Sequence, residues 1–385
     1  MSAKKQKIFI AVDSFKDCLS SREINEICKD TLLSLNSNLQ IDAYPISDGG
    51  EGFLDMILQT IGGEVNFLNV TGARGELIKS AYIIKKNIAY IEIAKIIGLE
   101  LLEKKQRHAI KTSSYGLGEL ILEIVNQKQI REIVIGLGGS STSDCGMGML
   151  AALGVRFYDK DNQILKGCGE NLVLIKRIDL NQVKMKLHDL SIKIVSDVVS
   201  PLLGEYGASY MFAEQKGASE SEIELLEQGS RNFAMLTSNI TEKNASKFKG
   251  AGSAGGLGYA FLQYFTSTIF NGLSYMCEYS DIEKCIENSD FVITGEGRVD
   301  CQTLHGKVPY GIAQIAKKYN KPVIVIAGNV GDKIDELNNQ GLDAIFSITP
   351  RPMSLQEALK KEVAKHNVAQ TITQIFKLTN YEKGE

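Results

Sequence analysis

The sequence predicts an α/β protein in which a Rossmann-like parallel-sheet domain, built from both termini, carries an inserted second α/β domain with a mixed sheet. Plain strand–helix alternation occurs at both ends of the chain, and a hairpin-containing stretch lies between them. A length of 385 residues suits about two domains. We expect the Rossmann-like domain at residues 1–63 and 285–385, the insertion at 64–284, and the active site in the cleft between them.

Two strand–helix units open the chain. Residues 8–12 form an apolar strand, and Ser20 with Glu23 predicts the capping box of the helix that follows. A second strand, residues 41–46, precedes a helix that starts at residue 53 and stops at two glycines. Successive units of this kind predict a parallel sheet.

The middle of the chain changes pattern. Residues 65–70, 79–84 and 88–93 read as strands, and residues 85–87 read as a hairpin turn. Residues 113–126 predict a helix. The short connections indicate antiparallel pairing, so the inserted sheet should be mixed.

Residues 132–154 contain the most informative loop. An apolar strand is followed by Gly138 and Gly139, then by hydroxyl residues and Asp144, and a helix is expected near Met147. Such a loop leaves backbone N–H groups for an anion, and its glycines allow close approach. The alternative is a tight turn with a capping Asp. A second glycine loop, residues 250–258, also precedes a helix.

Strand–helix alternation returns near residue 282. Residues 291–294, 322–327 and 344–348 are predicted strands, and Pro309 suits a helix start. Ser354 caps the last predicted helix.

Acidic residues follow the predicted strands repeatedly, and basic residues lie in similar loops. The acidic residues are Asp13, Asp48, Asp144, Asp197 and Glu296; the basic residues are Lys16, Arg74, Lys216, Arg298 and Lys307. Carboxylates that hold Mg²⁺ and cations that hold phosphate oxygens favour phosphoryl transfer. The alternatives are capping acids and solvated surface charges.

We assign roles on this basis. The predicted catalytic residues are Asp48, Asp197, Lys16 and Lys307, and the predicted metal ligands are Asp48, Asp144 and Asp197. Substrate binding is assigned to Asp13, Ser14, Arg298 and Glu296, and nucleotide binding to Gly138, Gly139, Ser140, Ser141, Thr142, Gly252 and Gly255. Arg298 offers a two-pronged guanidinium that would match a carboxylate on a substrate; the alternative is a structural pair with Glu296 or Asp300.

Composition and missing motifs argue against several classes of protein. A net charge of −3 argues against nucleic acid or an acidic membrane as partner, and the apolar run near the N-terminus is too short for a signal peptide or a membrane span. Seven cysteines without CxxC spacing suit reduced thiols in the cytoplasm, and four scattered histidines argue against zinc. Three motifs are absent: the Walker A motif of P-loop enzymes, a GxGxxG dinucleotide-binding motif after the first strand, and the GxSxG nucleophile elbow of hydrolases.

As a set, the motifs resemble the bacterial, two-domain glycerate kinases. The matching blocks, in order, are AVDSFKDCLSSREI, PISDGGEGF, IEIAKIIGL, TSSYGLGELI, GLGGSSTSDCGMGMLAALG, DVVSPLLG, FAEQKGAS, GAGSAGGLG and TGEGRVDCQTLHGKVP. The resemblance implies ATP-dependent phosphorylation of D-glycerate with Mg²⁺, at either the 2- or the 3-hydroxyl. It leaves the oligomeric state open, and a homo-oligomer is compatible with it.

The chain departs from the family pattern at several positions. Asp17, Cys18, Ser143 and Cys145 replace usual Gly, Ser, Asn and Gly, and Val199-Ser200 replaces a frequent Asp-Asn pair. The last change removes a carboxylate beside Asp197. Three alternatives are weighed: a kinase of the galactokinase and mevalonate kinase type, a noncatalytic sensor of phosphorylated metabolites, and a nicotinamide dehydrogenase.

Overall fold

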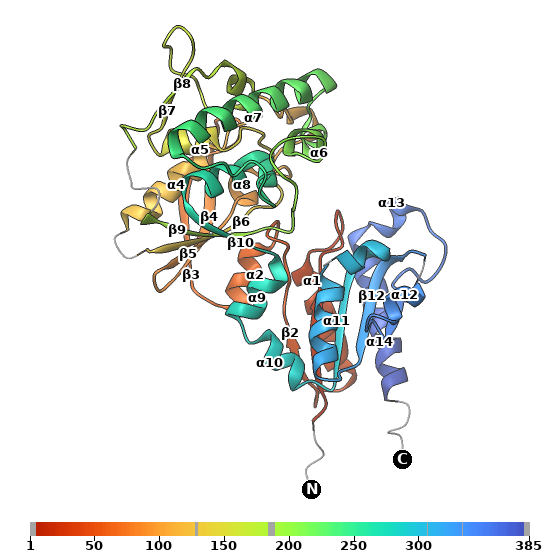
Figure 1. Cartoon of the computed structure of the whole chain (residues 1–385). Coiled ribbons are helices and arrows are strands. Elements are labelled where there is room, and N and C mark those ends of the chain that lie inside the picture. The colour runs from red at the N-terminus through yellow and green to blue at the C-terminus, as the bar shows by residue number, and fades with distance from the viewer. Residues whose placement is uncertain (1–4, 128–129, 184–188, 306, 333, 381–385) are drawn as a thin grey trace. The chain divides into compact units, whose positions relative to one another are not determined.

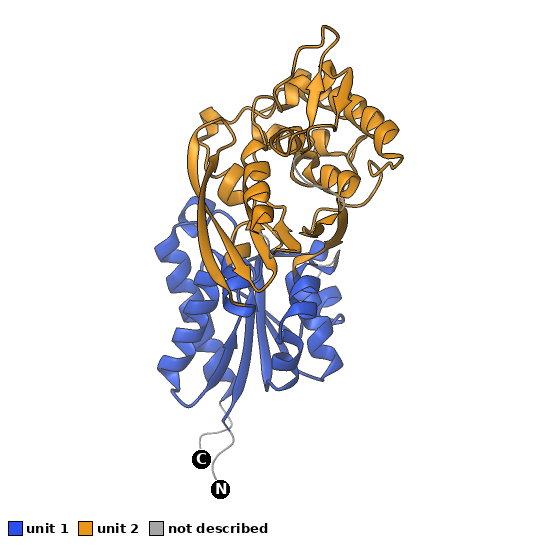
Figure 2. Ribbon diagram, turned by 90° about the vertical axis from the view of Figure 1, so that its left-hand side faces the viewer, with its two compact units in different colours: residues 1–47, 55–61, 273–385 blue, residues 48–54, 62–272 orange. Residues whose placement is uncertain are grey.

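The structure is a computed structural model, and it describes residues 5–127, 130–183, 189–305, 307–332 and 334–380 (Figure 1). The chain divides into two compact units (Figure 2). Unit 1 comprises residues 1–47, 55–61 and 273–385, and unit 2 comprises residues 48–54 and 62–272. The sequence-based boundaries at residues 63 and 284 and the cleft between two domains stay predictions.

Unit 1 contains a five-stranded sheet in which every neighbouring pair is parallel. Its order is β13-β12-β11-β1-β2, with bounds β1 Lys7–Val12, β2 Gln40–Ala43, β11 Phe291–Val299, β12 Val323–Val330 and β13 Ala344–Ser347. Numbered within the unit, the order is a doubly wound one that reverses direction between β1 and β11. The predicted parallel sheet built from both ends of the chain is therefore confirmed.

Apolar side chains of the central strands cover both faces of this sheet. Ile8 and Ile10 pack with residues of α1 (Ser21–Leu35) and α14 (Lys361–Thr379), such as Ile24 and Val368. Helix α11 (Val308–Lys318) lies against β11 and β1 (Figure 1). The other helices of the unit are α2 Phe53–Thr60, α9 Gly272–Tyr279, α10 Ile282–Glu287, α12 Ile334–Asn338 and α13 Leu355–Ala358, with a 3-10 turn at Cys301–His305.

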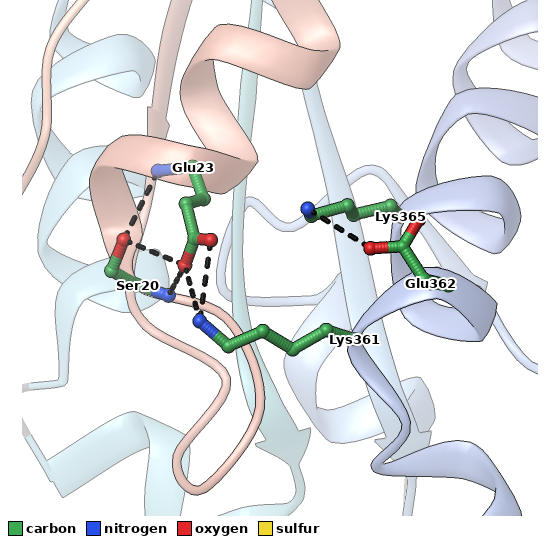
Figure 3. Close-up of polar contacts among 5 residues, drawn as sticks. All are labelled: Ser20, Glu23, Lys361, Glu362 and Lys365. Atoms are coloured by element: carbon green, nitrogen blue, oxygen red, sulfur yellow. Dashed lines mark hydrogen bonds and ion pairs between the residues drawn. The ribbon is translucent and has the colours of Figure 1, made fainter.

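The predicted capping box of α1 is confirmed (Figure 3). The Glu23 N–H donates to Ser20 Oγ over 3.2 Å, and the Ser20 N–H donates to Glu23 Oε2 over 2.9 Å. Lys361 Nζ lies 3.3 Å from Glu23 Oε1, which connects the start of α14 to the start of α1. Because this ion pair is exposed, it contributes at most about 1 kcal/mol.

The last predicted helix is interrupted. Ser354 accepts a hydrogen bond from the Glu357 N–H as expected, but α13 ends after one turn. Lys360 has an extended backbone, with φ −66° and ψ 122°, and α14 begins after it. The capping prediction was right, whereas the continuous helix was wrong.

Unit 2 contains the predicted mixed sheet, with order β10-β9-β6-β5-β4-β3. The bounds are β3 Glu64–Thr71, β4 Leu77–Lys85, β5 Ile88–Glu92, β6 Glu132–Gly136, β9 Ser191–Val195 and β10 Thr266–Phe270. Strands β3, β4 and β5 are antiparallel, and the rest of the sheet is parallel. Lys86, in the predicted hairpin turn, has φ +57°.

The helices of unit 2 surround an apolar core that includes Ile135, Leu150 and Phe261. They are α3 Ala94–Ile97, α4 Tyr115–Asn126, α5 Met147–Ala152, α6 Ala208–Phe212, α7 Glu220–Thr241 and α8 Ser253–Tyr264; 3-10 turns lie at Lys104–Gln106, Gly169–Leu174 and Glu214–Lys216. A separate two-stranded ribbon joins β7 Arg156–Tyr158 to β8 Arg177–Asp179. None of the described helices of either unit has the length and hydropathy needed to span a membrane.

Candidate active site

Loops from distant parts of the sequence meet at the carboxyl ends of β6 and β9 in unit 2. The Gly138 N–H donates to the Gly49 carbonyl over 2.9 Å. Gly49 has φ +93°, and a Cβ on it would lie 2.0 Å from the Val195 carbonyl oxygen. Only glycine fits this backbone contact. The loop that carries Asp48 is therefore fixed against the ends of both strands.

The two predicted nucleotide-binding loops also pack against each other. The Cys145 N–H donates to the Gly255 carbonyl over 3.0 Å, and a Cβ on Gly255 would lie 2.0 Å from the Thr142 carbonyl oxygen. The Gly252 N–H donates to the Ser200 carbonyl over 2.9 Å. The structure thus brings Gly252 and Gly255 together with the residue 138–142 loop, beside the segment that follows β9.

The hydroxyl groups of the first loop face inward. Ser140, Ser141 and Thr142 are buried, and Ser141 Oγ donates to the Ile97 carbonyl over 2.9 Å. Within the described part of the chain, the backbone N–H groups of Gly139, Ser140, Thr142 and Ser143 donate no hydrogen bond. Backbone N–H groups, rather than hydroxyls, are the donors that this loop offers an anion.

Asp144 contacts the starts of α4 and α5 through its carboxylate. Its buried carboxylate accepts hydrogen bonds from the N–H groups of Ser114, Gly146 and Gly148 and from Ser114 Oγ, over 2.7–3.1 Å. Burial raises the pKa of Asp144 from its ordinary value, although these donors act against that shift. These hydrogen bonds are the ones that the capping alternative expects, and the role of Asp144 as a metal ligand stays a prediction.

Asp48 and Asp197 are both oriented by backbone groups. Asp48 Oδ1 accepts from the Gly50 N–H over 2.8 Å, and Asp197 Oδ1 accepts from the Gly272 N–H over 3.0 Å. Among the described residues, no group of three or more His, Cys, Asp or Glu side chains could hold a metal ion. Mg²⁺ in kinases commonly uses one or two carboxylates plus substrate phosphates, so the two acids fit Mg²⁺ delivered with a nucleotide.

The predicted substrate-binding residues of unit 1 lie at the point where the strand order reverses. The Asp13 N–H donates to the Gly295 carbonyl over 2.9 Å, and the Ser14 N–H donates to Asp13 Oδ1 over 2.6 Å. Glu296 is the next residue of β11. Asp13, Ser14 and Glu296 therefore lie at the sheet edge where open α/β sheets bind ligands.

The charged side chains at this edge pair with one another. Glu296 accepts from Lys307 Nζ and from Thr303 Oγ1, each over 2.7 Å. Arg298 Nε lies 3.0 Å from Asp300 Oδ2, the pairing that the structural alternative expects, and its side chain is 69% exposed. Lys16 is exposed, in a loop that lies close to Gly297. The roles of these residues toward a substrate stay predictions.

The sequence placed Lys216 among the basic residues that favour phosphoryl transfer, but without a specific role. In the structure its side chain contacts the residue 138–142 loop. Its side chain is buried, and its Nζ donates to Ser140 Oγ over 3.0 Å and to the Thr142 carbonyl over 2.7 Å. Burial lowers the pKa of Lys216 to about 7. The available signal was its position in a short segment ending in Gly217, but burial of a lysine cannot be predicted from composition.

Comparisons with known proteins identify the family of this chain. The model of the glycerate kinase family matches residues 8–380. A glycerate kinase of Bacillus cereus is 37% identical over 371 residues, covering 96% of this chain and 97% of that protein. A glycerate 2-kinase of Escherichia coli is 35% identical over 373 residues, with coverages of 95% and 98%.

A solved structure supports the fold. A crystal structure from Salmonella typhimurium LT2, provisionally assigned as glycerate kinase 2, superposes with a TM-score of 0.82 at 35% identity. The alignment covers 99% of this chain and 100% of that one. The fold and the family match are those of a small-molecule kinase. Within that class, the chain belongs to the glycerate kinase family, and it phosphorylates glycerate.

Proposed function

We propose that this enzyme transfers the γ-phosphoryl group of ATP to a hydroxyl of D-glycerate. The observation that carries the proposal is the meeting of two glycine loops and two acidic loops at one edge of the unit 2 sheet. The backbone N–H groups of residues 139–143 suit the phosphates of a nucleotide. A noncatalytic sensor would have no use for the acids.

Asp48 and Asp197 are the residues that would hold Mg²⁺. When bound, the ion neutralises charge on the phosphates and aligns them. The hydrogen bonds from Gly50 and Gly272 fix one oxygen of each carboxylate. This orientation is set by the backbone before any ligand binds, which lowers the reorganisation needed for catalysis.

The residues of unit 1 suit the acceptor. Arg298 can clamp the glycerate carboxylate if it exchanges Asp300 for the substrate, and Asp13 with Ser14 can orient the attacking hydroxyl. Lys307 and Lys16 supply positive charge for the transferred group, and Glu296 fixes Lys307. We infer the 2-hydroxyl as acceptor because the Escherichia coli relative is a glycerate 2-kinase.

The test is ADP release from ATP and Mg²⁺ with D-glycerate, compared with L-glycerate and with no acceptor. Phosphorus NMR of the product distinguishes 2-phosphoglycerate from 3-phosphoglycerate. We expect ADP and 2-phosphoglycerate in equal amounts, and omission of Mg²⁺ should abolish both. Turnover with another acceptor but not with D-glycerate would support a different small-molecule kinase, and tight phosphoglycerate binding without any turnover would support the sensor.

A further inference from the structure

Lys216 is a buried lysine whose hydrogen-bond partners are neutral. Its side chain is only 3% exposed, and Nζ donates to Ser140 Oγ and to the Thr142 carbonyl. No carboxylate of the described residues forms an ion pair with it. Lysines are almost never fully buried unless they are paired. The position therefore needs an explanation beyond packing.

A second buried polar group lies on the same loop. Thr142 Oγ1 is fully buried and has no hydrogen-bond partner in the described structure. Leaving a buried hydroxyl unsatisfied is destabilising. The two groups meet at one residue, because Lys216 Nζ donates to the carbonyl of Thr142, whose hydroxyl is unsatisfied.

The charged groups around Lys216 do not remove this need. Asp144 and Cys145 are the titratable groups whose electrostatic effect reaches it, and both favour its charged form. Four hydrogen bonds already surround the Asp144 carboxylate, and the Cys145 thiol lies 3.2 Å from Ser230 Oγ. Burial raises the pKa of Cys145 to about 12, so the thiol is neutral near pH 7.

We propose that Lys216 is a positioning residue for nucleotide phosphates: it holds residues 140–142 from beneath and supplies the positive charge that the bound polyphosphate neutralises. The inference rests on the proposed function for the identity of the ligand. It predicts that affinity gained through Lys216 grows with the number of phosphates on the ligand. Because the side chain is buried, Lys216 would act on the phosphates indirectly, by fixing the loop and by the electric field of its charge.

The test compares Lys216→Met with the native enzyme. Methionine has a similar length and no charge, and removing an uncompensated buried charge should preserve or raise thermal stability. We expect weaker binding of Mg-ATP, Mg-ADP and inorganic tripolyphosphate, measured by calorimetry, by roughly tenfold to 100-fold, as for hydrogen bonds to charged groups. Adenosine affinity should stay within about twofold, because adenosine carries no phosphate.

Proton uptake gives a second readout that a structural role would not move. Binding an anion raises the pKa of Lys216 from about 7, so the native enzyme should take up a proton with tripolyphosphate at pH 7.5. Titrations in two buffers of different ionisation enthalpy measure this uptake. Lys216→Met should take up fewer protons than the native enzyme. Because the protonation of tripolyphosphate itself contributes equally to both, subtracting the two uptakes isolates the contribution of Lys216.

Lys193→Met is the matched control. Lys193 lies in the same unit, on β9, and its Nζ pairs with Glu132 Oε1 over 2.9 Å. This change should lower thermal stability and leave polyphosphate affinity alone. Equal losses of adenosine and tripolyphosphate affinity in Lys216→Met, or unchanged tripolyphosphate affinity, would overturn the inference. If Lys216→Met loses tripolyphosphate affinity but the native enzyme transfers no phosphoryl group from ATP to D-glycerate, the proposed function fails and the inference stands. If the native enzyme binds no polyphosphate, both fail.

Discussion

The charged residues of the candidate site are held in different ways in the two units. In unit 1, Glu296 pairs with Lys307, and Arg298 pairs with Asp300. In unit 2, Asp48, Asp144 and Asp197 accept hydrogen bonds from backbone N–H groups, and Lys216 donates to a serine hydroxyl and a carbonyl.

The two arrangements differ in what a charged ligand must do to bind. An ion pair between side chains is neutral, so a charged substrate must displace one partner before it can bind the other. A charge held by backbone dipoles keeps its full value and its orientation. We therefore expect changes in unit 2 to act on phosphate binding and the chemical step, and changes in unit 1 to act on substrate affinity.

The largest expected effect comes from Asp197→Asn. Asparagine keeps the oxygen that accepts from the Gly272 N–H but removes the charge that would hold Mg²⁺. kcat should fall on the order of 100-fold or more, with the thermal midpoint nearly unchanged. Asp179→Asn is the control, because Asp179 also ends a strand of unit 2 but pairs with Arg177 on the separate ribbon. Native turnover of Asp197→Asn over a Mg²⁺ titration would disprove the assignment.

The next effect concerns pH and the stability of unit 2. Burial lowers the folded-state pKa of Lys216 to about 7, far below its ordinary 10.5. Between these values the unfolded chain binds one more proton, so the free energy of unfolding should rise with pH, by at most about 1.4 kcal/mol per pH unit. Denaturant titrations at pH 7 and pH 9 measure the slope. Lys216→Met should lack this increment, and parallel curves for the two proteins would contradict the buried charge.

Arg298→Lys tests the side-chain pairs of unit 1. Lysine keeps the charge but loses the two-pronged geometry, so KM for glycerate should rise about tenfold while KM for ATP stays constant. Arg351→Lys is the matched control: Arg351 is an exposed arginine of unit 1 that pairs with Glu357. If glycerate kinetics are unchanged and only thermal stability falls, Arg298 is a structural partner of Asp300.

The smallest effect is expected for Gly139→Ala. Gly139 has φ +69°, and its Cβ would lie 3.5 Å from Ala94 Cβ, so the folded loop has room for a methyl group. The left-handed backbone costs about 1–2 kcal/mol, and KM for ATP should rise a few-fold as the loop shifts. Gly75→Ala is the control. Gly75 has φ +96° and no neighbour within 4 Å, so the substitution carries the same backbone strain at a position distant in sequence from the loop. A KM for ATP that rises equally in both variants would remove residue 139 from the nucleotide site.

Local patterns predicted most of the fold. The capping box of Ser20 and Glu23, the hairpin turn at Lys86 and the strand before Gly138 all depend on residues close in sequence, and the structure contains each of them. The interruption at Lys360 was missed because the apolar periodicity continues on both sides of it.

The candidate site was less predictable because its contacts are distant in sequence. Asp144 was taken as a metal ligand, but its main partner, Ser114, lies 30 residues earlier at the start of α4. The hydroxyls of residues 140–142 looked like ligand contacts, but they are buried by segments that the sequence does not place nearby. Lys216 reaches Ser140 across 76 residues. Residue type predicted what these groups can do, whereas tertiary contacts decide what each one does.

The position of β1 in its sheet has a consequence for biosynthesis. Strand β1 pairs with β11, and the hydrogen bond from Thr294 Oγ1 to the Ala11 carbonyl joins residues 283 positions apart in the sequence. At about 5–20 residues per second, translation needs on the order of tens of seconds to deliver that partner. The whole of unit 2 emerges from the ribosome during this interval, while one edge of β1 still lacks its neighbour. A nascent chain that stalls before residue 291 therefore exposes an apolar strand edge. Such an edge can bind a chaperone or pair with another chain and aggregate.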